Sequence, residues 1–541
     1  MRRVGRVIVL AAALTPVAAG VLDAQGRGGQ NWNTFNADAQ RTGWLRTETR
    51  ISAATLQKPS SGGFQLLWKV KPENEARQFN TLTQPLILGN LISHKGFKAL
   101  IFVGGSSDTV WAYDYDLAKV YWSQKLSTAS SQPGTPACPG GLTALTRNTP
   151  LNQSAVPGAP PVPGRAAGAG SALAPGPPAA RGPVQGINPN NLPIVNAVWT
   201  ISGGGMVHAL NPHIGTDLRM PTRLVPAGSK VIGSVLVNNT LYAVTTDSCA
   251  GAPNGVWALD VSNDGPGSTP KVWDSGDAPI AGSTGPTLGL NNVLYVAAGS
   301  GQSSYANAVV ALDAQTLQVR DWFTSSSPFV SAPVAFHHGG RDLVAVVNRD
   351  GRLYVLDGTT PGGTDHRTAL ARSSPYSSAE SATGAITTWQ DQDGVRWLLV
   401  ASAGPVHGDT RFQVSNGSVT QGTVAAFKLL DENGSLRLEP TWTSRDLISP
   451  ATPIVLNDVV FALSTGALRT TDPRMPAAQR LQRSNPAVLY ALDAKTGREL
   501  WSSGATISAS VQGMGPSGQD GQVYVVAADG TLYAFGLPLE R

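Results

Sequence analysis

The chain has 541 residues, of which 60 are Gly, 39 are Pro and 14% are charged. This composition excludes a protein of long helices, and the many short β-branched and aromatic runs separated by Gly, Asn and Asp favour an all-β fold. The net charge of +5 is carried by scattered Lys and Arg. Without a basic run, nucleic acid is not an expected partner.

The first segment resembles a secretory signal peptide. Arg2, Arg3 and Arg6 precede an apolar stretch over residues 7–19, and small residues follow. Cleavage after Ala19 or Ala24 is expected, so residues 1–24 are assigned to the signal and the mature chain to the periplasm or the extracellular space. The apolar stretch is too short to span a membrane comfortably, and no transmembrane segment is expected in the mature chain. An N-terminal segment over residues 25–62 then leads to the repeats.

The remainder, residues 63–541, is built from a repeated unit. "TVWAYDYDLAKVYW", "GVWALDVSNDG", "AVVALDAQTLQVRDW", "GRLYVLDG" and "VLYALDAKTGRELW" are copies of one pattern, and each copy has short apolar runs upstream. A unit therefore contains four strands joined by turns that carry Gly, Asn or Asp, which is the sequence form of one blade of a β-propeller. Since a single blade leaves both faces apolar, neighbouring blades must cover each other.

Two residue types of the unit are expected to dock the blades. An Asp closes the turn after the third strand with its own side chain, and a Trp at the end of the fourth strand covers the gap between neighbouring blades. The expected docking residues are Trp68, Trp122, Trp273, Trp322, Trp442, Trp501, Asp114, Asp260, Asp313, Asp357 and Asp493.

The number of copies predicts eight four-stranded antiparallel blades. Seven remains an alternative, because in the second unit Asn211 replaces the Asp and no Trp follows. The last copy, "GTLYAFG", has no Trp after it, whereas "FQLLWKV" with Trp68 supplies a lone strand near the start of the chain. We expect this N-terminal strand to join the last blade and close the ring, which hides two sheet edges.

One insertion interrupts the repeats. Residues 128–193 are rich in Pro, Gly and Ala and have few large apolar side chains, so most of this range is predicted to be a mobile loop within or after the first blade. The loop either binds a partner, covers the channel or has no function. The two cysteines of the chain, Cys138 and Cys249, are candidates for a disulfide because export makes one possible.

The stretch "ALDAKTGRELW" resembles the tryptophan-docking repeat of pyrroloquinoline-quinone (PQQ) propellers, and "NWNTFNADAQRTGW" is similar to the N-terminal segment of quinoprotein alcohol dehydrogenases. The resemblance covers nearly the whole mature chain. It implies the propeller fold. For the enzymes of the superfamily it also implies PQQ, a calcium ion held by Glu, Asn and Asp, an Asp general base and a disulfide between adjacent cysteines.

The enzymatic features are not matched in this sequence. There is no adjacent cysteine pair and no Cys-x-x-Cys-His haem motif, and no Glu falls in a calcium-ligand motif, so no catalytic or cofactor-binding residue is assigned. His337 and His338 are adjacent but have no third ligand at metal spacing, and they are expected in a hairpin turn.

The sequence therefore predicts an exported, PQQ-like propeller that is a non-catalytic scaffold, with no cofactor expected. Its partner would be an envelope or extracellular protein, or a small ligand on a propeller face. The first alternative is a PQQ- and calcium-dependent dehydrogenase or its remnant. The second is a carbohydrate-binding propeller.

Overall fold

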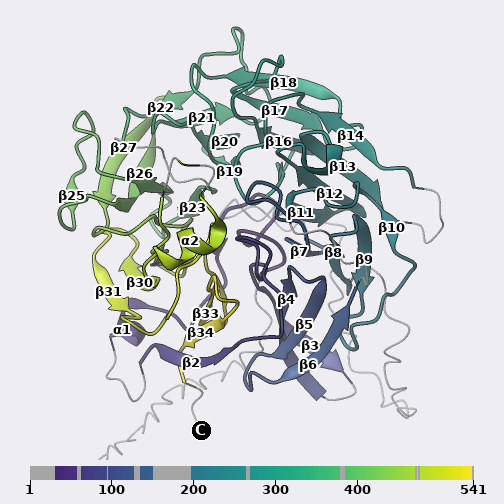
Figure 1. The fold of residues 1–541 in the computed structure, drawn as a ribbon. Helices are drawn as coiled ribbons and strands as arrows, with labels where there is room; N and C mark the ends of the chain where they lie inside the picture. Colours follow the sequence, from purple (N-terminus) through teal and green to yellow (C-terminus); the bar gives the residue numbers. More distant parts are fainter. Residues whose placement is uncertain are drawn as a thin grey trace, which may run out of the picture.

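The structure is a computed structural model that describes residues 31–57, 63–93, 96–126, 134–149, 151, 196–262, 268–377, 384–469, 472 and 475–538. These residues form eight β-sheets arranged around one axis, so the chain is an eight-bladed β-propeller (Figure 1). Each sheet is one blade, and the strands of a blade follow one another from the axis outward.

The first four blades each have four strands. The first blade contains β3 (Leu86–Ser93), β4 (Gly96–Gly105), β5 (Thr109–Asp114) and β6 (Val120–Lys125), and the second contains β7 (Leu145–Arg147), β8 (Val198–Ile201), β9 (Met206–Leu210) and β10 (Thr222–Arg223). The third blade contains β11 (Val231–Val237), β12 (Thr240–Thr245), β13 (Gly255–Asp260) and β14 (Lys271–Asp274). The fourth contains β15 (Thr287–Leu288), β16 (Val293–Ala297), β17 (Ala308–Asp313) and β18 (Val319–Thr324).

Blades five to eight follow the same plan, with an added strand in two of them. The fifth blade contains β19 (Val334–His338), β20 (Arg341–Val347), β21 (Leu353–Asp357) and β22 (Ala371–Arg372), and the sixth contains β23 (Thr387–Gln390), β24 (Arg396–Ala403), β26 (Gly422–Glu432) and β27 (Ser435–Thr443), with β25 (Val414–Ser415) added. The seventh blade contains β28 (Ile454–Leu456), β29 (Val459–Ser464), β30 (Val488–Asp493) and β31 (Glu499–Ser502), with β1 (Trp44–Leu45) added. The eighth contains β32 (Ser517–Gln519), β33 (Gln522–Val526), β34 (Leu532–Gly536) and β2 (Gln65–Val70).

The eighth blade confirms the predicted ring closure. Strand β2, which contains Trp68, pairs antiparallel with β34, so that Trp68 lies opposite Ala534. The chain therefore supplies the outer strand of the last blade from its N-terminal part and the other three strands from its C-terminal part. The predicted number of eight blades is confirmed and the alternative of seven is wrong, because the degraded second unit also forms a full blade, β7 to β10.

The core is divided into layers between neighbouring blades. One apolar cluster, for example, joins Val235 and Tyr242 of the third blade to Leu288, Leu294 and Val296 of the fourth. The Ala at the centre of the repeated motif is buried in these layers, at Ala112, Ala258, Ala311 and Ala491. Its small side chain allows two sheets to approach closely, and each large apolar side chain buried there contributes about 1.5–3 kcal/mol.

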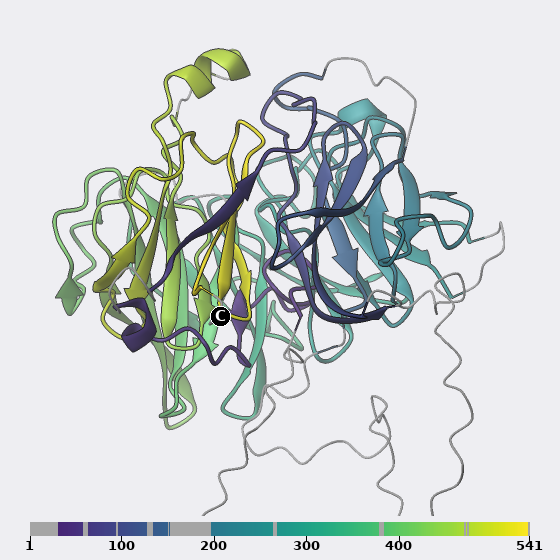
Figure 2. The same cartoon turned by 90° about the horizontal axis from the view of Figure 1, so that it is seen from below.

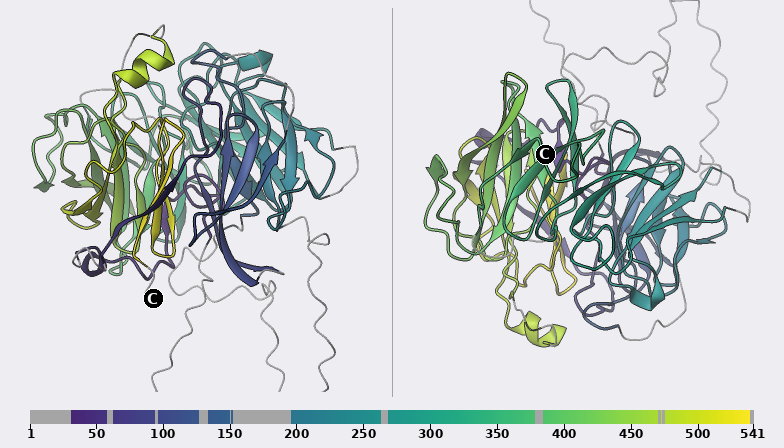
Figure 3. Two further views of the ribbon diagram at one scale, coloured as in Figure 1. Left: turned by 60° about the horizontal axis from the view of Figure 1, so that its bottom comes forward. Right: turned by 90° about the horizontal axis from the view of Figure 1, so that it is seen from above.

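Because neighbouring strands of each blade are antiparallel, the connections between them lie at two different ends of the ring. Connections between the second and third strands, and between one blade and the next, lie at one end, which we call the loop face. Connections between the first and second strands lie at the other, the turn face. The loop face carries the helix α2 (Ala477–Gln482) and the short helix η4 (Cys249–Gly251). In Figures 2 and 3, α2 stands out from the ring.

Three sequence predictions concern parts of the chain that are only partly described. The predicted signal peptide lies outside the described residues. Of the predicted insertion, the structure describes residues 134–149 and 151, and it places β7, the inner strand of the second blade, in this range. The N-terminal segment contains β1 and the one-turn helix α1 (Ala53–Leu56). No helix among the described residues is long and apolar enough to cross a membrane.

Candidate functional site

The axial channel of the ring is occupied by the chain itself. Residues 31–45, which we call the channel hairpin, enter the ring from the turn face beside β3, reverse near Asn36, and leave beside β28 as strand β1. The hairpin is antiparallel to β3 at Trp32 and parallel to β28 at Trp44. In Figure 1 this N-terminal segment is the purple trace at the centre of the ring.

The channel hairpin makes a hydrogen bond to each of the eight blades, and six of these bonds join main-chain atoms. They are Ile87 N to Trp32 O (3.1 Å), Arg147 N to Asn33 O (2.8 Å), Leu288 N to Ala39 O (2.9 Å), Ala335 N to Gln40 O (3.0 Å), Thr388 N to Thr42 O (2.9 Å) and Val455 N to Gly43 O (2.8 Å). The two remaining blades are reached through side chains, by Thr34 Oγ1 to Ser234 O (2.8 Å) and by Trp32 N to Gln519 Oε1 (3.1 Å). The inner strands need these partners because they have no neighbouring strand on the axial side.

A buried arginine holds the reversal of the hairpin. The Arg41 guanidinium donates to Pro286 O (3.0 Å), Thr34 Oγ1 (2.8 Å), Phe35 O (2.9 Å) and Ser234 O (3.2 Å), all of them neutral acceptors. Burial lowers the pKa of Arg41 to about 9, and the charge of Asp38 opposes this shift. The hairpin also has positive φ at Asn36, Ala37 and Arg41. Non-glycine residues rarely adopt this conformation, so the surrounding ring must stabilise it.

Carboxylates and amides do converge in the channel, but they bind the chain's own polar groups. Asp38 accepts from Thr42 N (3.0 Å) and Thr42 Oγ1 (2.6 Å), and burial raises the pKa of Asp38. Gln84 Oε1 accepts from Asn36 N (3.2 Å) and its Nε2 donates to Pro516 O (2.9 Å). These polar groups are therefore used to hold the channel hairpin in the axis of the ring.

These side chains do not fit a calcium-bound quinone. Both Asp38 oxygens accept hydrogen bonds from Thr42, and the buried Glu48 carboxylate, which follows the hairpin in the chain, accepts from the main-chain N–H groups of Arg50, Ile51 and Gly521. Burial raises the pKa of Glu48 as well. Calcium instead prefers several ionised or carbonyl oxygens that are free to turn toward it. Within the described ranges, no group of three or more His, Cys, Asp or Glu is placed to hold a metal.

The two cysteines are bonded to each other, with a Cα–Cα distance of 5.6 Å. Cys138 lies in the connection from the first blade to the second, and Cys249 in η4 of the third blade. The bond therefore fastens two connections of the loop face to each other. His337 and His338 end strand β19, and His337 Nδ1 lies 2.9 Å from Asp342 Oδ1 across the hairpin.

The five predicted turn carboxylates all accept main-chain N–H groups two or three residues further along the chain. The acceptor and donor pairs are Asp114 with Asp116 and Leu117, Asp260 with Ser262, Asp313 with Gln315 and Thr316, Asp357 with Thr359 and Thr360, and Asp493 with Lys495 and Thr496. In each case the side chain closes the turn that follows the third strand of its blade.

Two of the predicted tryptophans bond directly to the next blade. Trp122 Nε1 donates to Pro212 O (2.8 Å), and Trp442 Nε1 donates to Ala494 O (3.0 Å). Each of the two rings lies against a glycine of that blade. A Cβ on Gly215 would lie 2.6 Å from Trp122, and one on Gly497 would lie 2.4 Å from Trp442. The glycine of the repeat thus makes room for the indole of the preceding blade.

The other four tryptophans make ring contacts. Trp322 stacks on His366 of the next blade with 4.0 Å between ring centres, and Trp273 lies 5.8 Å from Tyr305. Trp501 contacts Phe64 (4.9 Å) and Phe535 (5.7 Å), and Trp68 lies 5.9 Å from Tyr524. These residues are spread around the ring, so the structure does not bring the predicted docking positions together into one site. The channel hairpin was missed as a site, because its polar residues follow no strand or turn pattern.

Comparison with known proteins agrees with this geometry. A family model described as outer membrane protein assembly factor BamB matches residues 470–536, which contain parts of the last two blades. No curated protein matches the chain in sequence.

Solved structures match over nearly the whole chain. A quinohemoprotein alcohol dehydrogenase from Comamonas testosteroni is 13% identical, with 95% of this chain and 81% of the other covered and a TM-score of 0.54. A europium-containing methanol dehydrogenase is 12% identical, with 94% and 98% covered and a TM-score of 0.56. At this identity the likeness shows the fold alone: the chain has the β-propeller fold that the resemblance to PQQ propellers implies.

Proposed function

We propose that this protein is an exported, non-catalytic scaffold that binds a partner protein on its loop face. The observation that carries the proposal is the channel hairpin, which occupies the axis of the ring and is bonded to all eight blades. A quinone at the axis would have to displace these bonds, and each buried main-chain group left without a partner would cost about 1–3 kcal/mol.

The loop face has the rigidity that a binding surface requires. Four segments, which we call the loop belt, are fastened to one another: residues 74–80, 134–142, η4 and α2. Arg480 of α2 lies 5.0 Å from the ring centre of Phe79, and Gln78 Nε2 donates to Gly134 O (2.7 Å). The disulfide then joins residues 134–142 to η4. The belt thus connects loops of blades seven, eight, two and three, and a preorganised surface of this kind loses less entropy when it binds.

The family model that matches residues 470–536 supports the same proposal, because its description is that of an assembly factor. The matched range includes α2 of the loop belt. The proposal includes export of the chain by a signal peptide at residues 1–24. To test this, residues 1–24 are fused to a reporter that is active only outside the cytoplasm, and the reporter should be active.

The catalytic alternative has a direct test. The purified full chain is mixed with PQQ and Ca²⁺, and a cofactor absorption band and dye-linked alcohol oxidation are measured. We expect neither signal. An absorption band together with turnover of an alcohol would overturn the proposal and favour the dehydrogenase.

The binding surface is tested by site-specific cross-linking in the native host. A photoreactive amino acid replaces Gln479, which is exposed on α2, and in a matched variant it replaces Ser435, which is exposed at the turn face. A scaffold that uses the loop face should give adducts of discrete mass from position 479 and none from position 435. Equal labelling from both positions, or none from either, would contradict the use of the loop face.

A further inference from the structure

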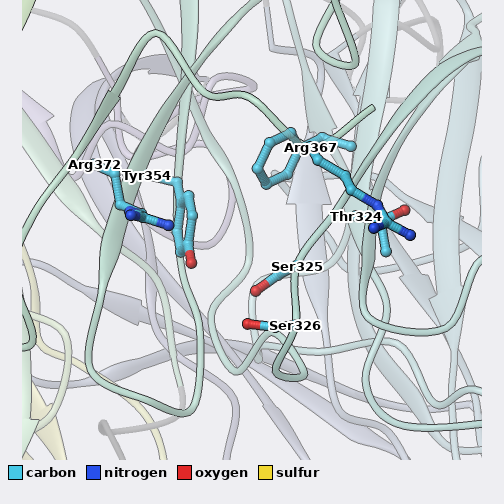
Figure 4. A pocket seen from close by; sticks show the side chains of 7 residues that line it. Thr324, Ser325, Ser326, Tyr354, Arg367 and Arg372 are labelled. Atoms are coloured by element: carbon cyan, nitrogen blue, oxygen red, sulfur yellow. The ribbon is translucent and has the colours of Figure 1, made fainter. Parts of the chain in front are cut away.

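A cavity lies away from the axis, between the fourth and fifth blades. It has a volume of about 310 Å³, which is within the range of small-ligand sites (Figure 4). The fourth blade contributes Phe323 and the hydroxyl groups of Thr324, Ser325 and Ser326. The fifth blade contributes Tyr354, Arg367 and Arg372.

The two arginines lie on opposite sides of this cavity. In Figure 4, Arg372 lies beside Tyr354, and Arg367 lies across the cavity beside Thr324. Arg367 belongs to the connection between β21 and β22, which is fastened to the fourth blade at the preceding residue, His366. The His366 ring stacks on Trp322, its Nδ1 lies 2.7 Å from Trp322 O, and its carbonyl accepts from Thr324 N (2.7 Å).

The buried amide of Asn348 determines whether two hydroxyl groups of the cavity, those of Ser325 and Tyr354, donate or accept hydrogen bonds. Asn348 Nδ2 donates to Ser325 Oγ (3.1 Å) and to Tyr354 Oη (3.4 Å), and its Oδ1 accepts from Arg352 N (3.1 Å). Both hydroxyl groups therefore act as acceptors toward Asn348 and keep their own hydrogens. In the described part of the chain, neither hydroxyl donates to an acceptor, although both side chains are buried. They are available as donors to a ligand.

The two arginines of the cavity are exposed and positively charged. Neither Arg367 nor Arg372 forms an ion pair through its guanidinium with any residue that the structure describes. Two carboxylates of the surrounding loops are engaged elsewhere: Asp350 accepts from Ser327 Oγ (2.8 Å), and Asp365 accepts from the N–H groups of Arg367 (2.9 Å) and Thr368 (2.8 Å). Among the described residues, no carboxylate lines the cavity. A lining of donors and cations complements an acceptor that carries negative charge.

From this geometry we propose that the cavity binds a small organic oxyanion, a carboxylate or phosphate group attached to a body about the size of one ring. The guanidinium groups of Arg367 and Arg372 hold the acidic group, and the hydroxyl groups of Tyr354 and Ser325 donate to it. The rings of Phe323 and Tyr354 supply the apolar wall for the body of the ligand. This site is separate from the channel hairpin and does not depend on the proposed scaffold function.

Isothermal titration calorimetry of the full chain tests the proposal. D-glucuronate and glucose 6-phosphate are the two organic anions, inorganic phosphate is the anion without a ring, and D-glucose is the neutral control. At least one of the organic anions should bind in the range of about 10 μM to 1 mM. The stronger of the two identifies the acidic group, and D-glucose should not bind. Inorganic phosphate that binds as tightly as the organic anions would overturn the part of the proposal that concerns the ring.

Matched variants locate the site. R367Q/R372Q should weaken binding at least tenfold, whereas R411Q/R498Q, which removes the same charge from exposed positions elsewhere, should leave it unchanged. Y354F keeps the ring and removes only one donor, so a threefold to tenfold loss is expected even if the double variant is unstable. No binding of any anion, or equal binding by R367Q/R372Q and the unchanged chain, would overturn the proposal.

Discussion

Arg41 is a buried cation whose four hydrogen bonds all go to neutral oxygens of the hairpin and of the third and fourth blades. It donates to the carbonyl groups of Pro286 and Ser234, which belong to the inner part of the fourth and third blades, and to the carbonyl group of Phe35 in the hairpin itself. The charge itself is costly there, because burial lowers the pKa of Arg41 to about 9.

We therefore expect Arg41→Met to destabilise the chain by about 3 kcal/mol, because Pro286 O and Phe35 O lose the donor that Arg41 supplies, whereas Ser234 O keeps Thr34 Oγ1. The free energy of unfolding from urea denaturation measures this loss. The exposed Arg498→Met is the control and should change it by less than about 0.5 kcal/mol. If the two variants are equally stable, the hairpin is not held through Arg41.

Asp38 should make stability depend on pH. Burial raises its pKa, so the folded chain keeps the proton at pH values where the unfolded chain has released it. The free energy of unfolding then falls as pH rises from about 4 through the raised pKa. Asp38→Asn cannot ionise, so its stability relative to the unchanged chain should rise over the same window. Urea denaturation from pH 4 to pH 8 checks this, and a difference that is constant or falls with pH would contradict it.

Gly497 tests the docking of one blade on the next. It has a φ of +71°, and an added Cβ would lie 2.4 Å from Trp442 Cε3. Gly497→Ala should destabilise the folded chain in two ways, because it strains the left-handed backbone and displaces the Trp442 indole. Gly434→Ala is the control for the backbone strain alone, since Gly434 also has a positive φ (+88°) but has open space around it. We expect Gly497→Ala to lower the free energy of unfolding by about 1–3 kcal/mol more than Gly434→Ala does. Equal losses would mean that the indole does not need the glycine.

At the scale of elements, the disulfide joins segments that are 111 residues apart in the sequence. Closing a loop of this length restricts the unfolded chain, so the pair of substitutions Cys138→Ser and Cys249→Ser should lower the free energy of unfolding by about 3–5 kcal/mol. Thermal unfolding with and without a reductant measures this. The reductant should destabilise the unchanged chain and leave the variant as it was. A reductant that has no effect on the unchanged chain would contradict the prediction.

The blades could be predicted from sequence because their determinants are local. The turn after each third strand is closed by an Asp only two or three residues away from its donors, as at Asp493, and the strands alternate in a regular way. The second blade left seven as an alternative to eight, because Asn211 replaces the Asp; in the structure, Asn211 Oδ1 accepts from His213 N (2.9 Å) and closes the same turn. Local chemistry of this kind leaves a repeated pattern in the sequence.

The channel hairpin and the cavity between the fourth and fifth blades could not be predicted, because their partners are far apart in sequence. Gly43 O meets Val455 N, and the cavity combines Ser325 with Arg367 and Arg372 from another blade. Most hairpin bonds use main-chain atoms, which every residue type has, so the side-chain pattern carries no trace of them. The pairing of Cys138 with Cys249 likewise required the distance between two blades.

For the whole molecule, the N-terminal part has two separable roles, since the channel hairpin fills the axis and β2 closes the ring. The blades of a propeller support one another only in a closed circle, and an open ring would expose β34 as an unpaired edge together with the apolar faces of the first and last blades.

Two shortened chains distinguish these roles. A chain that begins at Arg46 lacks the hairpin and keeps β2, so it should still unfold in one cooperative transition, at a lower Tm because the inner strands have lost their axial partners. A chain that begins at Lys71 also lacks β2, so it should lose the cooperative transition and aggregate through the free edge of β34. Differential scanning calorimetry and size-exclusion chromatography measure both outcomes. If the two chains have the same Tm and both remain monomeric, then the ring is closed by packing between blades rather than by the strand that the N-terminal part supplies.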